Sequence, residues 1–92
     1  MNPTGAATQI YSSHFDRRFL NLPQDIQRRI QQRVDELGLD LRKFSHHRMQ
    51  GVDAFRLRVG DYRIVYQFSV TKNELYLIAV GNRRDIYEKL FN

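Results

Sequence analysis

The sequence predicts an α+β fold: a small antiparallel sheet, made of a short N-terminal strand and a three-strand C-terminal meander, with a helical hairpin packed on one face. Apolar residues at helical spacing within residues 13–37 indicate the two helices. Alternating and continuous apolar runs within residues 55–80 indicate the meander, and a short helix is expected to follow it. Ninety-two residues suffice for one domain, residues 1–92, with a single core.

The N-terminal segment is expected to hold the first strand and the first helix. Residues 1–7 carry neither the charged nor the apolar stretch of a secretory signal, and we expect them to be disordered. Residues 8–12 predict a short strand, on context more than on pattern. Ser13 opens a Ser-x-x-acid helix start, and Phe15 and Phe19 then fall one turn apart on one face.

The second helix is expected to begin at Pro23, because proline's missing N–H would be unpaired at the first helical position. An apolar stripe follows at spacings of four, four and three residues, and Gly38 is expected to end the helix. The stripe consists of Ile26, Ile30, Val34 and Leu37. Two helices joined at a proline can lie as a hairpin across the sheet.

Residues 39–54 show no regular period and predict a basic connecting loop. Its basic side chains are weaker candidates for contacts with RNA phosphates: Lys43, His46, His47 and Arg48. Adjacent histidines without a third ligand at metal-binding spacing are a weak metal signal. We therefore expect no metal and no other cofactor.

The segment Phe-Arg-Leu-Arg-Val-Gly-Asp-Tyr-Arg-Ile-Val-Tyr, residues 55–66, predicts a β-hairpin. Its first strand alternates apolar and basic residues, and the Gly-Asp pair suits a two-residue type II′ turn. With this turn Arg58 lies opposite Arg63, and Arg56 shares their face. Like charges directly across a strand pair are destabilising, so the three arginines predict a polyanionic ligand. A three-residue loop would break this arrangement.

Residues 74–80 are nearly all apolar, as expected for a strand at the centre of the sheet. The chain then enters the expected last helix, on which Arg83 and Tyr87 are four residues apart and can project together. With the three hairpin arginines they would surround a cleft. Such a cleft could hold an RNA phosphate and stabilise its charge during displacement.

Composition restricts the function further. The formal charge is +5, and residues 42–92 carry the whole excess, with ten basic and five acidic residues. Twelve of the fifteen basic residues are arginine, the type that grips phosphate in a planar, bidentate way. The chain has no cysteine, which excludes thiol nucleophiles and suits the reducing cytoplasm. It has no apolar run of roughly 18 residues and so no expected membrane span.

The hairpin segment carries a resemblance to a known family. Gln50-Gly51, residues 55–66 and the run Ala-Val-Gly-Asn-Arg-Arg-Asp-Ile-Tyr of residues 79–87 resemble the C-terminal half of the RelE/ParE superfamily of bacterial and archaeal toxins. The likeness covers nearly the whole chain, because the helical hairpin, meander and short last helix are similar to that family's layout. It implies an antiparallel sheet with two helices packed on one face.

For RelE-type members the resemblance implies ribosome-dependent, metal-independent cleavage of messenger RNA, by attack of a ribose 2′-hydroxyl on the adjacent phosphate. It places Arg56 and Arg58 where basic strand residues hold the phosphate, and Arg63 at a further phosphate contact. Arg83 would neutralise or protonate the leaving group, and Tyr87 would activate the 2′-hydroxyl or orient the base. These five are the expected catalytic residues.

The resemblance also leaves alternatives. Asn82 stands where some relatives carry histidine, so no histidine base is expected there. Arg63 is also explained as a scaffold arginine, and Tyr87 as a packing residue. The expected partners are a cognate antitoxin, the ribosome and mRNA, with no small-molecule ligand. A ParE-like, non-enzymatic inhibitor of DNA gyrase and an inactive regulatory relative are the other two functions that the residues allow.

Overall fold

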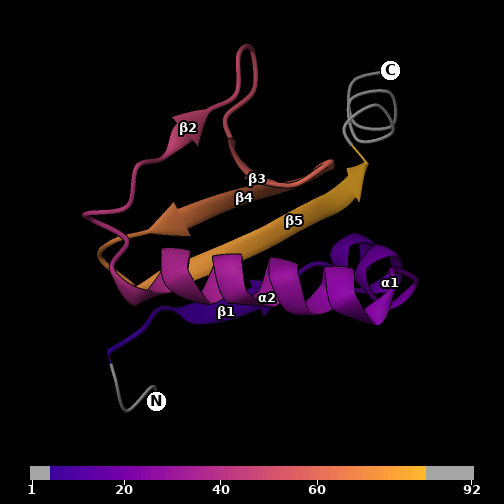
Figure 1. Ribbon diagram of the computed structural model, residues 1–92. Coiled ribbons are helices and arrows are strands. Elements are labelled where there is room, and N and C mark those ends of the chain that lie inside the picture. Colours follow the sequence, from indigo (N-terminus) through magenta and orange to yellow (C-terminus); the bar gives the residue numbers. More distant parts are fainter. Residues whose placement is uncertain (1–4, 83–92) are drawn as a thin grey trace.

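Five strands and two helices make up residues 5–82, which are the residues that the computed structural model describes (Figure 1). The α+β class is confirmed. The strands lie in the order β1-β5-β4-β3-β2. In chain order the elements are β1 (Thr8–Tyr11), α1 (Ser13–Leu20), α2 (Gln24–Leu39), β2 (His47–Arg48), β3 (Phe55–Val59), β4 (Tyr62–Ser69) and β5 (Glu74–Asn82). The expected C-terminal helix, with Arg83 and Tyr87, lies outside the described residues.

The first helix starts one residue earlier than its sequence signature suggests. Ser12, not Ser13, is the N-cap, and its hydroxyl accepts a hydrogen bond from the backbone N–H of Phe15 at 3.0 Å. The predicted apolar face is present, since the rings of Phe15 and Phe19 stack with centroids 5.5 Å apart. This face anchors α1 against β5.

The second helix runs one residue past Gly38, which therefore does not end it. Gly38 is buried, and its carbonyl accepts a hydrogen bond from the backbone N–H of Ala7 at 2.7 Å. Ala7 is itself only 3% exposed, so the prediction of disorder through Ala7 is wrong at that residue. The hydrogen bond between Ala7 and Gly38 holds the chain that enters β1 close to the end of α2.

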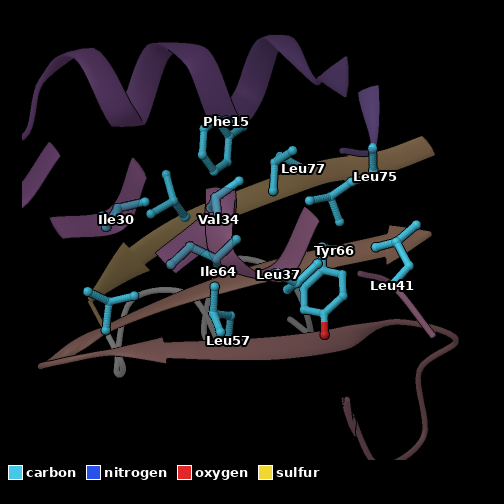
Figure 2. Packing of buried hydrophobic residues seen from close by; sticks show 13 residues of the cluster. Phe15, Ile30, Val34, Leu37, Leu41, Leu57, Ile64, Tyr66, Leu75 and Leu77 are labelled. Carbon is cyan, nitrogen blue, oxygen red and sulfur yellow. The ribbon is translucent and has the colours of Figure 1, made fainter. Parts of the chain in front are cut away.

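The core lies between the helices and one face of the sheet (Figure 2). Ile30, Val34 and Leu37 of the predicted stripe are buried on α2, and Phe15 joins them from α1. The sheet meets them with side chains from its three central strands, among them Leu57, Ile64, Tyr66, Leu75 and Leu77. Burying these apolar side chains stabilises the fold by roughly 1.5–3 kcal/mol each before entropy is counted.

The predicted hairpin register is confirmed. Val59 pairs with Tyr62, which leaves Gly60 and Asp61 as a two-residue loop, and Arg58 lies opposite Arg63. Gly60 has a φ of +58° whereas Asp61 does not have a positive φ. A positive φ at the first central position alone is the mark of a type II′ turn.

The sheet differs from the predicted one in two respects. β1 pairs with β5 in parallel, so the sheet is mixed. Residues 39–54, expected as a loop, contribute the two-residue strand β2, which pairs antiparallel with β3 at the sheet edge. A two-residue strand has too short a pattern to be read from sequence, and its position depends on pairing with β3. Within residues 5–82 no helix is long and apolar enough to span a membrane.

Candidate functional site

The basic residues of β3 lie on the face of the sheet that the helices leave uncovered. Leu57 and Val59 point into the main core, and strand alternation therefore directs Arg56 and Arg58 to the opposite face. Both arginines are exposed. Arg63 shares their face through its pairing with Arg58, but it is only 4% exposed. The structure thus brings the three hairpin arginines together on one face at two different depths.

His47 completes this arrangement from the edge strand. It pairs with Arg56 across β2 and β3, and directly opposed residues of an antiparallel pair place their side chains on the same face. A pocket of about 300 Å³ opens here, and the described residues that line it are His47, Arg56 and Arg58. We name these three residues the cationic pocket. It contains two residues expected to be catalytic and one expected only as a weaker RNA contact.

Apolar side chains, two of them alanines, cover the sheet face beside the cationic pocket. Met49, Ala54, Val65 and Ala79 form a second buried cluster, on the side of the sheet away from the helices. Val65 pairs with Arg56 on one side and with Ala79 on the other, so this cluster lies directly beside the basic row. Ala54 and Ala79 have short side chains, which project only a little from the sheet at this point.

A β-bulge lies at the same place. Val65 pairs with Ala79 but Tyr66 pairs with Leu77, so Ile78 is the extra residue on β5. The Ser12 hydroxyl donates a hydrogen bond to the Ile78 carbonyl at 2.5 Å, which satisfies a group that the bulge removes from the regular ladder. Bulges are enriched next to active sites because they redirect side chains. No local sequence pattern predicts this bulge.

The arginine charges of the cationic pocket are unpaired within the part of the chain that the structure describes. Within residues 5–82, no hydrogen bond or ion pair engages the side chains of His47, Arg56 or Arg58. Arg48 differs, because its guanidinium bonds the Asp53 carboxylate at 2.7 Å and lies 5.6 Å from the centre of the Phe55 ring. Two unpaired guanidinium groups on neighbouring positions of one strand form a positive site for an anion.

The other predicted RNA contacts are placed differently. His46 lies in an aromatic cluster, stacked on Phe68 with ring centroids 4.0 Å apart. Its Nδ1 lies 2.7 Å from the Tyr66 hydroxyl and its Nε2 lies 2.7 Å from the Leu41 carbonyl oxygen, so both ring nitrogens have internal partners. We therefore leave His46 out of the proposed RNA contacts. Lys43 is exposed, and it does not line the cationic pocket.

No arrangement suited to a metal ion is present in residues 5–82, where no three histidine, cysteine or carboxylate side chains come together. The described site offers two guanidinium groups and an imidazole. Guanidinium groups can bind a phosphate and neutralise developing charge, and an imidazole can accept or donate a proton near neutral pH.

Solved structures share this fold. The isolated RelE toxin of Escherichia coli matches with a TM-score of 0.71 and 19% identity over 91% of this chain and 94% of its own. The intact RelBE toxin–antitoxin complex of E. coli gives 0.70 and 21% over 84% and 96%. The RelBE2 complex of Mycobacterium tuberculosis gives 0.70 and 18% over 85% and 92%. The fold is thus that of RelE-like toxins.

The family follows from the sequence match. Residues 10–87 match the family described as the ParE toxin of the type II toxin–antitoxin system parDE. The matched segment contains both helices, the whole hairpin and the cationic pocket. The chain belongs to this family and is a toxin of the RelE/ParE superfamily. No curated protein matches it significantly.

Proposed function

We propose that this toxin is a ribosome-dependent endoribonuclease that cleaves mRNA by attack of a ribose 2′-hydroxyl on the adjacent phosphate. The observation that carries the proposal is the cationic pocket. Arg56 and Arg58 present guanidinium groups that have no partner among residues 5–82, beside an imidazole and on the face of the sheet that the helices leave uncovered. An RNA phosphate meets the charge and geometry of this site, and charge that develops on its oxygens would be stabilised there.

Arg63 has a supporting role in this proposal. Its side chain is 4% exposed and lies across from Arg58, so its positive charge acts from beneath the pocket surface. A fixed charge under a site raises the local positive potential without needing direct contact with the ligand. Arg83 and Tyr87, which lie outside the described residues, are proposed to neutralise the leaving group and to orient the 2′-hydroxyl or the base.

The proposed regulation is inhibition by a cognate antitoxin. RelE-like structures include complexes with their antitoxins, and this chain belongs to a toxin family of type II toxin–antitoxin systems. The exposed Arg56 and Arg58 would attract an acidic or amphipathic antitoxin segment. A segment lying over the cationic pocket would block access of RNA to it.

A second candidate is inhibition of DNA gyrase without catalysis, and the match to the ParE family model favours it. A gyrase inhibitor needs a docking surface but no group that transfers a proton or stabilises a pentavalent phosphate. The two functions therefore differ in whether Arg56 and Arg58 are essential. An inactive regulatory relative would show neither activity.

The deciding experiment compares both activities of the purified toxin. Cleavage of translated mRNA is mapped by primer extension in a reconstituted translation system, and gyrase supercoiling is measured beside it. We expect cleavage by the wild type, and a loss of about 100- to 1,000-fold in Arg56→Ala and in Arg58→Ala, the usual effect of removing one group that stabilises a transition state. Arg28→Gln, an exposed arginine on α2, is the matched control and should cleave normally. Inhibited supercoiling without cleavage would refute the proposal.

A further inference from the structure

His47 is distinguished from the other two histidines by its surroundings. His46 has both ring nitrogens engaged within the aromatic cluster. His14 lies on α1, on the helix side of the sheet. His47 alone lines the cationic pocket, where its side chain is exposed and opposite Arg56. Its position places an imidazole beside the groups proposed to hold the phosphate.

The described lining of the pocket offers no competing base. It contains no carboxylate, and an arginine guanidinium does not give up its proton in proteins. Asn82, at the end of β5, has an amide that cannot accept a proton at neutral pH. A phenol with the unperturbed pKa near 10 is almost wholly protonated at pH 7. Imidazole is the side-chain group best matched to proton transfer near neutral pH.

We propose that His47 is the general base of RNA cleavage at the cationic pocket. This inference rests on the proposed endoribonuclease function and extends it. His47 sits on the two-residue strand β2, and only its pairing with β3 brings the imidazole to the two arginines. Pairing with β3 also fixes the direction of the side chain, which suits a catalytic group that must be held in place.

The neutral His47 imidazole takes the proton of the 2′-hydroxyl while O2′ forms a bond to the adjacent phosphorus. The bond between phosphorus and the 5′-oxygen breaks, and the departing 5′-oxygen takes a proton from water. The products are a 2′,3′-cyclic phosphate and a 5′-hydroxyl. Arg56 and Arg58 stabilise the negative charge on the phosphate oxygens throughout, and His47 returns its proton to the solvent.

The test measures single-turnover cleavage of mRNA on programmed ribosomes between about pH 6 and pH 8.5. For the wild type we expect a rate that rises with pH through the range in which imidazole loses its proton. His47→Gln should be slower by about 100- to 10,000-fold and should lack this rise. Added imidazole should restore part of the activity of His47→Ala, because it can enter the vacated site. His14→Gln is the matched histidine control and should keep the wild-type rate and profile.

The outcomes separate the two proposals. A wild type that cleaves, with a His47→Gln variant of equal rate and pH profile, would overturn the role of His47 and leave the endoribonuclease intact. A slow His47→Ala variant with an unchanged pH profile and no response to imidazole would show a structural role and also overturn it. A wild type that does not cleave translated mRNA would refute both. Circular dichroism verifies folding, and His47→Asn replaces any variant that does not fold.

Discussion

At the scale of single residues, the contact between His46 and Tyr66 fixes the connecting segment to the sheet. The Leu41 carbonyl oxygen can only accept a hydrogen bond, so Nε2 of His46, which lies 2.7 Å from that oxygen, must carry a proton. A neutral His46 then has an unprotonated Nδ1, which accepts from the Tyr66 hydroxyl at 2.7 Å. The residue next to His46 is His47, so this anchor also holds the start of β2 in place.

Removing the Tyr66 hydroxyl tests this anchor. Tyr66→Phe leaves Nδ1 of His46 without its partner, and we expect a loss of about 1 kcal/mol in the free energy of unfolding at pH 7. Burial raises the pKa of the Tyr66 phenol, so above pH 10 this group ionises first in the unfolded chain. The wild type should therefore lose stability as pH rises above 10, by up to about 1.4 kcal/mol per pH unit from this group. Urea unfolding at pH 7 and at pH 10 to 11 measures both effects.

The phenylalanine variant cannot ionise, so the stability difference between wild type and Tyr66→Phe should shrink above pH 10. Tyr62→Phe is the control, since Tyr62 is half-buried and its hydroxyl makes no hydrogen bond within residues 5–82. Its change at pH 7 should stay within about 0.5 kcal/mol. A Tyr66→Phe difference that stays constant across this pH range would contradict the assigned role of burial.

At the scale of elements, the turn between β3 and β4 determines the strand register, and the register places Arg56, Arg58 and Arg63 on one face of the sheet. Gly60→Ala would force an alanine into a φ of +58°, with its Cβ 3.2 Å from the end of the Arg29 side chain. A non-glycine residue in this region costs roughly 1–2 kcal/mol. Because the end of Arg29 is flexible and can move aside, we expect the loss of unfolding free energy to stay near this backbone value. Urea unfolding measures it.

Gly51→Ala is the matched control for the turn. Gly51 has a φ of +76°, but nothing lies within 4 Å of an added Cβ, so its cost comes from the backbone alone. The two variants should agree within about 0.5 kcal/mol. A much larger loss in Gly60→Ala, relieved by Arg29→Ala in the same chain, would show instead that Arg29 is held rigidly over the turn.

The elements show which parts of the structure a sequence can predict. The hairpin was predictable in register because a two-residue turn and an alternating strand together determine which residues face each other. The helices were predictable because their apolar stripes are local. The strand β2, the parallel pairing of β1 with β5 and the bulge at Ile78 depend on partners distant in sequence, so no local pattern encodes them. His47 was underestimated for this reason.

At the scale of the whole molecule, the second half of the sequence carries the excess positive charge. The positions of these basic residues in the fold decide which of them can bind an anion. Residues 42–92 carry ten basic and five acidic residues, and this excess predicted an anionic partner. Depth was not predictable, since alternation gives the face of Arg63 but not its 4% exposure. Nor does the number of charges show that Arg48 is paired with Asp53, while Arg56 and Arg58 have no acidic partner within the described residues.

If the cationic pocket binds RNA, the salt dependence of binding should depend on where an arginine lies and not on the net charge. Arg56→Gln with Arg58→Gln removes two contacts, and we expect the slope of log affinity for single-stranded RNA against log salt to become shallower by about 1.4, or about 0.7 per phosphate contact. Arg17→Gln with Arg28→Gln removes the same charge from exposed helix positions and should leave the slope nearly unchanged. Fluorescence anisotropy with a labelled RNA measures both. Equal changes in the two double variants would mean that RNA binds the positive surface diffusely, because only a defined site distinguishes between arginines of equal charge.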